Sequence, residues 1–277
     1  MIILNSVSDF KSFFIKTILN FKGLTYVNLE YAENNNLDYS LMLTTLVYIN
    51  SPINDSERMI TKKIKSLIKI QETKKNNIYV SENENNYSRF LKKDVVLKDP
   101  YVIIRFLQDL CYPPSLYPTS MEKRLFIHIN EKDIFKTLFE HMYNFEKNLL
   151  IEYGGNNGYN FKKILKLKQI SLGNEKVKIE FNKIVELLSF ITKIIIKNIN
   201  SKYFFYDNLN PIELLFYCFI DRLFQYNLIN NKISLNSILL KKYNLIKKEL
   251  LNQDSDHKVV DYQNLDLSKR ISIISTP

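Results

Sequence analysis

Residues 111–118 read CYPPSLYP, and this stretch decides the fold of the chain. Its three prolines (Pro113, Pro114 and Pro118) fix the backbone φ angle and remove hydrogen-bond donors, so the stretch cannot be helical. Strand and helix patterns alternate before it, whereas nearly everything after it has helical periodicity. We therefore predict two domains, residues 1–112 and residues 113–251, that meet at this proline-rich hinge.

The first thirty or so residues predict a compact strand–helix–strand unit. Ile2–Leu4 is a short apolar run, and Ser8 or Asp9 is placed to cap the helix that follows. Gly23 is free to take the left-handed conformation that ends a helix. Residues 24–31 then alternate with period two, as a half-buried strand does.

The rest of the first domain predicts two further strands and a helix. Residues 32–76 are rich in Asn, Ser and Lys, and we interpret them as an insertion with a possible helix after Asp55. Ile78–Ser81 and Asp94–Lys98 are typical of a strand pair. Pro100 then opens a helix, where its missing N–H costs nothing.

The second domain is predicted to be all helical. Thr119 and Glu122 form a capping box that starts a helix running to about residue 150. Residues 151–173 hold four of the five glycines and indicate a second insertion or loop. Apolar residues from Val177 to Ile195 then recur at spacings of three and four, which predicts a long amphipathic helix.

The strongest local signal in this domain is the run Asn210–Pro211–Ile212–Glu213. It combines a cap residue, a first-turn proline and a glutamate at the third helical position. A last amphipathic helix is expected over about residues 234–251, and we expect residues 252–277 to be a flexible tail.

The net charge of +10 is weak evidence for nucleic-acid binding. The chain has 33 Lys against 6 Arg and a single alanine, a pattern that a strongly AT-biased genome imposes on any protein. Lysine-rich segments such as Thr61–Lys69 and Lys162–Lys168 are more typical of solvated helix faces than of a nucleic-acid site. We predict no direct sequence-specific binding of nucleic acid.

The same composition excludes several other classes of protein. A hydrophobic content of 45% and a charged content of 25% exclude wholesale disorder. No apolar stretch approaches the roughly 20 residues that span a bilayer, and no secretory leader is evident, so we expect a cytoplasmic protein without membrane contact. The cysteines are too few for a disulfide scaffold and the histidines lack metal-ligand spacing, so we expect no metal (Cys111, Cys218; His128, His141, His257).

The predicted order of elements resembles the glutathione S-transferase architecture, a thioredoxin-like α/β N-terminal domain followed by an all-α C-terminal domain. Within that superfamily the sequence is similar to the stringent starvation protein A family of RNA-polymerase-associated proteins. Five stretches carry the resemblance: SDFKS (8–12), KDPYVIIRFL (98–107), CYPPSLYP (111–118), RLFIHINEKD (124–133) and YFFYDNLNPIELLFYCFIDRL (203–223). The fourth is the most specific of them.

The resemblance implies a non-catalytic transcription regulator that binds RNA polymerase holoenzyme under starvation or stress. It also implies a dimer, either of identical chains or with a paralogue. In the family, the hinge and its neighbours form a pocket implicated in contact with polymerase. The matching partner-binding residues here are Tyr112, Pro113, Pro114 and Gln108, and a plain interdomain elbow is the alternative interpretation.

The sequence departs from the family pattern where glutathione would bind. No proline precedes the expected third strand Ile78–Ser81, and Asp99–Pro100 replaces the Glu–Ser pair that holds the γ-glutamyl end of glutathione. Ser6 and Ser8 lie at the turn where such enzymes activate the thiol, but serines there also cap the helix. We therefore predict no catalytic residues and no cofactor.

Two alternatives keep the same fold. One is a true glutathione S-transferase or peroxidase. The other is a eukaryotic scaffold, either a metaxin-like protein of the mitochondrial outer membrane or a docking module of a tRNA-synthetase complex.

Overall fold

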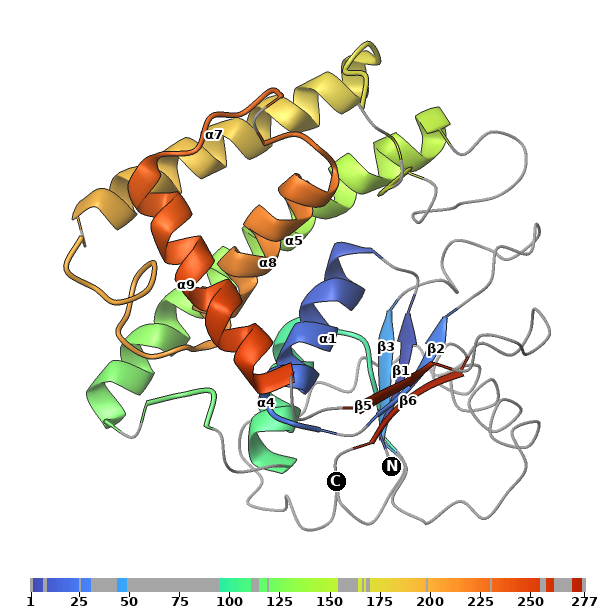
Figure 1. The fold of residues 1–277 in the computed structure, drawn as a ribbon, viewed down its shortest axis with the longest axis vertical. Coiled ribbons are helices and arrows are strands. Elements are labelled where there is room, and N and C mark those ends of the chain that lie inside the picture. The colour runs from blue at the N-terminus through green and yellow to red at the C-terminus, as the bar shows by residue number, and fades with distance from the viewer. Residues whose placement is uncertain are drawn as a thin grey trace.

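The computed structural model describes residues 2–6, 9–24, 26–30, 44–48, 95–110, 115–118, 120–153, 164–165, 167, 170–197, 199–229, 231–254, 258–261 and 271–275. Its strands form one six-stranded sheet in the order β4-β3-β1-β2-β6-β5. Helix α1 lies between this sheet and the helices of the second half of the chain (Figure 1).

The first three elements confirm the predicted strand–helix–strand unit. Strand β1 (Ile2–Ser6) and strand β2 (Tyr26–Glu30) run parallel, and α1 (Phe10–Phe21) connects them. Asp9 caps α1 because its side chain accepts a hydrogen bond from the Ser12 N–H. Gly23 has a φ of 61°, so it takes the left-handed conformation predicted for the end of this helix.

The third strand lies elsewhere than the sequence indicated. Strand β3 (Thr45–Tyr48) pairs antiparallel with β1, and β4 (Val95–Leu97) pairs antiparallel with β3 and leads into α4 (Pro100–Leu110). β3 therefore falls inside the segment 32–76 that we interpreted as an insertion, whereas Ile78–Ser81 and the possible helix after Asp55 lie outside the described residues. Four residues are too short a run to stand out, although Leu46 is fully buried.

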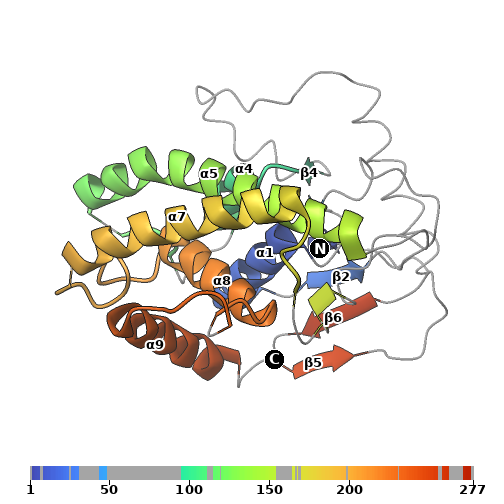
Figure 2. The ribbon, with the colours of Figure 1, turned by 90° about the horizontal axis from the view of Figure 1, so that it is seen from above.

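Four long helices make up the second half. They are α5 (Met121–Tyr153), α7 (Glu175–Lys197), α8 (Pro211–Gln225) and α9 (Ser237–Asp254). The six apolar positions of α7 at spacings of three and four are all buried: Val177, Phe181, Ile184, Leu188, Ile191 and Ile195. Figure 2 shows these four helices on one side of the sheet, with α1 next to it.

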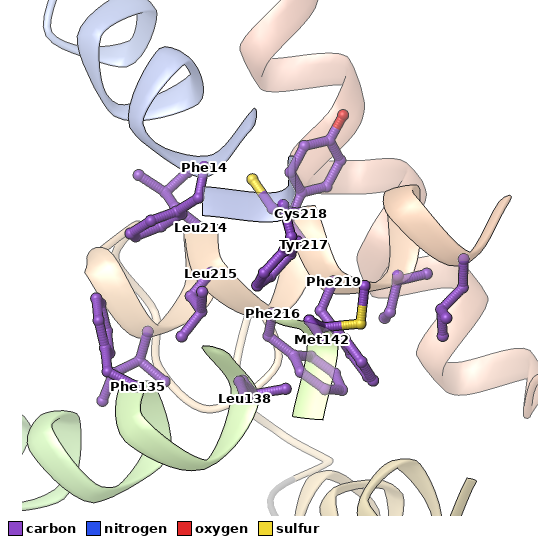
Figure 3. Close-up of a cluster of buried hydrophobic side chains, with 14 of the residues drawn as sticks. Phe14, Phe135, Leu138, Met142, Leu214, Leu215, Phe216, Tyr217, Cys218 and Phe219 are labelled. Atoms are coloured by element: carbon purple, nitrogen blue, oxygen red, sulfur yellow. The ribbon is translucent and has the colours of Figure 1, made fainter. Parts of the chain in front are cut away.

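The core joins the two halves around α8, whose residues Pro211–Ile220 are all buried. Phe14 of α1 packs edge-on against Phe135 of α5, with ring centroids 5.4 Å apart. Leu214 and Phe216 of α8 belong to the same cluster of side chains, in which α1, α5 and α8 meet (Figure 3). This shared core holds the helices against the sheet through α1.

A buried ion pair reinforces that junction. Glu146 of α5 accepts hydrogen bonds from Arg222 Nε at 2.8 Å and from the Tyr226 hydroxyl at 2.6 Å. Its second oxygen accepts from the backbone N–H of Phe10, the first residue of α1, at 2.8 Å. One donor is the first residue of α1, and the other two are in α8 and directly after it. This one carboxylate therefore ties α5 to both α1 and α8.

Capping of α8 agrees with the prediction, but Glu213 does something the pattern did not indicate. Asn210 accepts from the N–H groups of Ile212 and Glu213, as a cap residue should. Glu213 itself accepts three backbone hydrogen bonds from residues 204–206. Burial raises its pKa to about 8. The Glu213 side chain therefore binds the loop before α8, whereas a capping box would have it bind the backbone of the cap residue Asn210.

The end of the chain differs from the flexible tail that we expected. Strand β6 (Ile271–Ser275) pairs antiparallel with β2, and β5 (Lys258–Asp261) pairs antiparallel with β6. These two strands cover the β2 edge of the sheet, which would otherwise leave backbone groups unpaired. Among the described helices, none is long and apolar enough to cross a membrane.

Candidate functional site

The turn after β1 is where a thiol-activating residue is expected in this architecture. Ser6 ends β1 with no exposed surface, and its hydroxyl donates to the Asn28 side-chain oxygen of β2 at 2.9 Å. Ser8 lies outside the described residues. The described hydroxyl at this turn therefore points into the sheet and not toward a ligand.

The start of α1 is closed by a second set of hydrogen bonds. The Asp9 carboxylate accepts from the Ser12 N–H at 2.7 Å and from the Thr44 hydroxyl at 2.9 Å. Thr44 immediately precedes β3, the position at which thioredoxin-like domains usually carry a proline. Ser12 and Thr44 are both fully buried, so this polar group faces the protein interior.

The start of α4 is occupied in the same way. The Asp99 carboxylate accepts from the N–H groups of Tyr101 and Val102 at 2.8 and 3.1 Å. Pro100, which lies between Asp99 and Tyr101, has no backbone N–H to donate. The Lys11 ammonium donates to the Lys98 carbonyl beside this turn, and burial lowers the pKa of Lys11. Internal partners thus hold the donors at the front of α4.

Gln108, which the sequence indicated as a partner contact, instead holds the hinge. Its side-chain oxygen accepts from the Leu116 N–H at 2.7 Å, and its amide nitrogen donates to the Ser115 hydroxyl at 3.2 Å. Gln108 is half-buried. The other three indicated residues, Tyr112, Pro113 and Pro114, lie outside the described residues, so their role as contacts stays a prediction.

A group of aromatic and charged side chains lies where α4, the hinge and α5 meet. We call it the Arg105 cluster; it consists of Tyr101, Arg105, Tyr117, His128 and Glu131. The guanidinium lies 5.0 Å from the centre of the Tyr101 ring and 5.3 Å from that of Tyr117. It also donates to the Tyr101 hydroxyl at 2.6 Å. Rings and hydrogen bonds therefore fix its orientation.

The cluster rests on a buried carboxylate. Glu131 has no exposed surface, and the Tyr117 hydroxyl donates to it at 2.7 Å. Arg105 approaches the same carboxylate at 3.8 Å. Burial raises the pKa of Glu131 to about 7, although the Tyr117 hydrogen bond and Arg105 both oppose this shift. The carboxyl therefore titrates near neutral pH.

His128 connects the arginine to the glutamate. Burial, together with the charges of Arg105 and Arg124, lowers the pKa of His128 to about 4, so the ring is neutral at pH 7. Its Nδ1 lies 2.6 Å from one terminal nitrogen of Arg105 and 3.2 Å from the Glu131 carboxylate, and its Nε2 lies 3.1 Å from the other terminal nitrogen of Arg105. Because a guanidinium can only donate, the unprotonated nitrogen of the neutral ring accepts from Arg105.

Of the remaining cysteines and histidines, the structure describes Cys218 and His141, and both make contacts within the fold. Cys218 is buried, its sulfur lies 3.3 Å from the Thr17 hydroxyl, and burial raises the pKa of its thiol well above the ordinary range. His141 of α5 lies 3.9 Å from Glu180 of α7. Cys111 and His257 are outside the described residues. Within the described chain, no three His, Cys, Asp or Glu side chains come together as a possible metal site.

Sequence reasoning did not single out the Arg105 cluster. The sequence pointed to His128 only as a histidine without metal-ligand spacing, and it indicated no individual role for Tyr117, Arg105 or Glu131. The available signal was the spacing of Arg124, His128 and Glu131 along one side of a single helix. That spacing says nothing about α4, which supplies the arginine.

The order of elements decides the fold. A parallel β1–α1–β2 unit, an antiparallel β3–β4 pair with α4, and an all-helical second half make an α/β thioredoxin-like domain joined to an all-α domain. The fold is glutathione S-transferase-like.

Solved structures of three glutathione transferases match this fold. A diazinon-metabolizing enzyme of the silkworm Bombyx mori is 14% identical, with 92% of this chain and 96% of that chain covered and a TM-score of 0.45. A family member from Pseudomonas fluorescens with two bound glutathiones is 10% identical, covers 92% and 88%, and has a TM-score of 0.47. A Tau class enzyme from mango is 16% identical, covers 92% and 89%, and has a TM-score of 0.42.

At such identities the likeness carries no conclusion about activity, substrate or partner. No family model matches the sequence, and no curated protein sequence matches it.

Proposed function

We propose that this chain is a non-catalytic protein of glutathione S-transferase-like fold that acts by binding RNA polymerase holoenzyme, as the stringent starvation protein A family does. The observation that supports a non-catalytic role is that the protein's own side chains already make the hydrogen bonds at the positions where glutathione would bind. Three positions contribute: the turn after β1, the residue before β3 and the start of α4.

The start of α4 gives the sharpest argument. A helix N-terminus offers backbone N–H groups to an anion, and this is where the γ-glutamyl carboxylate of glutathione would bind. Here the carboxylate of Asp99 already accepts from two of those groups. A bound carboxylate would have to displace Asp99 and would meet its negative charge.

The turn after β1 is equally unsuited to activating a thiol. A thiolate needs a hydrogen-bond donor or a positive charge nearby. The Ser6 hydroxyl already donates to Asn28, and the Thr44 hydroxyl already donates to Asp9. A thiolate at this turn would lie near the Asp9 carboxylate, which disfavours it. The Lys11 ammonium, a cation near Asp9, already donates to the Lys98 carbonyl.

The proposal for the partner rests on the five matched stretches and on the proline-rich hinge. A proline-rich segment loses little conformational entropy on binding, and Gln108 adds two hydrogen bonds that hold it against α4. We propose that Tyr112, Pro113 and Pro114 contact the polymerase and that Gln108 positions them. The proposal includes a cytoplasmic location and a dimer, of identical chains or with a paralogue.

Co-purification tests the proposal. The tagged chain, expressed in the cells that naturally produce it, should retain the polymerase core subunits and the housekeeping sigma factor. Tyr112→Ala should lose them, whereas Tyr143→Ala, the same change at an exposed tyrosine of α5, should keep them. Absence of polymerase subunits with the unaltered chain would overturn the proposal.

A parallel assay tests the enzyme alternative. The purified chain should show no heat of binding to glutathione in calorimetry and no conjugation of glutathione to chlorodinitrobenzene. Retention on glutathione-agarose together with conjugation would show an enzyme and would contradict the non-catalytic assignment.

A further inference from the structure

The beginning of α5 exposes two large apolar side chains next to the hinge. Met121 is 85% exposed and Leu125 is 59% exposed, and no other described large hydrophobic residue is as exposed as Met121. Isolated exposed apolar residues are common on protein surfaces and need no explanation. These two are one helical turn apart, and their surroundings are charged.

The two apolar residues share a helix face with cationic and polar ones. Residues 121, 124, 125 and 128 follow the i, i+3, i+4, i+7 spacing that places side chains along one stripe of a helix. The stripe therefore reads Met121, Arg124, Leu125, His128. Glu122 and Lys123 point to other sides of the helix and carry opposite charges. We call this stripe, together with Arg105, the α5 patch.

Arg105 extends the α5 patch from helix α5 to helix α4. It contacts His128 through its guanidinium nitrogens, and its side chain remains 36% exposed. Its Nε is buried and has no hydrogen-bond partner among the described residues. Two aromatic rings hold the guanidinium in place, so it would lose little side-chain entropy on pairing with an anion.

We propose that the α5 patch is a docking surface for an acidic segment of the protein partner, with a carboxylate against Arg105 and Arg124 and an apolar side chain between Met121 and Leu125. The inference rests on the proposed function, because it assigns the chemistry of the partner bound beside the hinge. Arginines flanked by exposed apolar side chains are enriched in interface hot spots.

Charge distinguishes this occupant from a second copy of the chain. A symmetric dimer through the patch would bring the same surface against itself, so Arg105 and Arg124 would face their own copies. Like charges facing each other cost several kcal/mol. An acidic partner meets the same cations favourably. Glu131 lies 3.8 Å from Arg105 and offsets part of its charge, which leaves Arg124 as the main cation of the α5 patch.

Methyl-labelled methionine makes the patch directly observable by NMR. The chain has five methionines, and Met121 is exposed on the patch whereas Met142 is fully buried in the core. The probe is a short peptide in which aspartates alternate with leucines, compared with the same peptide carrying asparagine in place of aspartate. The acidic peptide should shift the Met121 methyl resonance and leave that of Met142 in place, and the asparagine peptide should bind more weakly.

Point variants test which side chains are responsible. Arg124→Gln and Leu125→Ala should each weaken binding of the acidic peptide at least about fivefold. Lys123→Gln is the matched control, because it removes a positive charge from the same turn but from another side of the helix. Both exposed positions lie outside the core, and equal melting temperatures would show that folding is intact.

The outcomes separate this inference from the proposed function. No shift of Met121 with the acidic peptide, or equal losses in Arg124→Gln and Lys123→Gln, would overturn the docking surface even if polymerase co-purifies. A shift of Met121 that Arg124→Gln weakens, without polymerase in the pull-down, would support the surface and overturn the proposed partner. Loss of polymerase in Arg124→Gln but not in Lys123→Gln would support both.

Discussion

Helix α5 carries two glutamates that each pair with an arginine and a tyrosine, yet the two groups are built for different purposes. Glu146 meets Arg222 and Tyr226, and the side chains of the ion pair are only 3% exposed. Glu131 meets Arg105 and Tyr117, but there the arginine side chain is 36% exposed. The first group joins the two halves of the fold, and the second lies at the hinge.

The hydrogen bonds explain the difference. The Glu146 carboxylate accepts three hydrogen bonds of 2.6 to 2.8 Å. The donors are Phe10 of α1, Arg222 of α8 and Tyr226, which follows α8. At Glu131 the arginine is 3.8 Å away and a neutral histidine lies between. A buried polar network whose members are all hydrogen-bonded rigidifies a structure, whereas the arginine of the second group is partly exposed and can meet another partner. The same three residue types therefore serve stability in one place and, by our proposal, recognition in the other.

Removing the charge of the buried group should have the largest effect. Glu146→Gln leaves Arg222 buried without its counterion, which typically costs about 3–5 kcal/mol. Urea unfolding followed by circular dichroism measures the free energy of unfolding. Glu140→Gln, the same change at an exposed site of α5, should cost less than about 0.5 kcal/mol. Equal stabilities of the two variants would contradict the structural role of Glu146.

The hinge group should differ by responding to pH. Burial raises the pKa of Glu131 to about 7, above the value of about 4.3 in an unfolded chain. The folded state therefore binds this proton more tightly, so the stability it contributes is present below about pH 4 and is lost as the pH rises through about 7. The Glu131→Gln variant has no titrating carboxyl at this position, so its stability lacks this pH dependence. The wild type should lose about 3 kcal/mol relative to this variant between about pH 4 and pH 8.

Unfolding curves of both proteins across that range measure the difference. Thr137→Ala, an exposed change on α5 without a titrating group, should give a constant offset from the wild type. A constant offset for Glu131→Gln as well would show that this carboxyl does not titrate near neutral pH.

The two tyrosines give a smaller and more direct comparison. Tyr226→Phe removes a buried hydroxyl that donates to Glu146 at 2.6 Å and should cost about 2 kcal/mol. Tyr117→Phe removes the donor to Glu131 and should cost about 1 kcal/mol, because a carboxyl with a pKa of about 7 is only partly charged at pH 7. Thermal and urea unfolding at pH 7 measure both. The reverse order of the two costs would show that the hinge group is the more tightly built one.

Local patterns in the sequence predicted the elements that local physics decides. The caps at Asp9 and Asn210, the left-handed Gly23 and the buried stripe of α7 all depend on neighbours within a few residues. The sequence also indicated the glutathione S-transferase-like fold, through the resemblance of its element order. Whether Tyr112, Pro113 and Pro114 contact a partner stays a prediction.

Contacts between distant residues could not be predicted in this way. Strand β3 is recognisable because Leu46 pairs opposite Leu4 of β1, and β6 because it pairs with β2. Neither partner is near in sequence. The Arg105 cluster likewise joins α4 to α5 across the hinge, so no pattern within either helix indicates it. The sequence indicated Gln108 as a partner contact, which stays a prediction, and its hydrogen bonds to the hinge could not be foreseen because they depend on how the chain turns after α4.

The finest comparison uses two backbone amides, each held by a side chain. The Phe10 N–H donates to Glu146 at 2.8 Å inside the core, and the Leu116 N–H donates to Gln108 at 2.7 Å in the hinge. Gln108→Leu removes the second acceptor and should cost about 1 kcal/mol. Amides released by local opening exchange faster than those that need global unfolding. Hydrogen exchange at Leu116 should therefore quicken in this variant.

Exchange at Phe10 should follow global stability alone, because its partner lies in the fully buried group. Gln225→Leu, at a half-buried glutamine near the end of α8, is the matched control and should leave the Leu116 amide unchanged. If Gln108→Leu quickens Leu116 and Phe10 equally, the hinge unfolds only together with the core. A selective effect at Leu116 would instead show that Gln108 holds the hinge locally while the buried group keeps the two halves of the fold together.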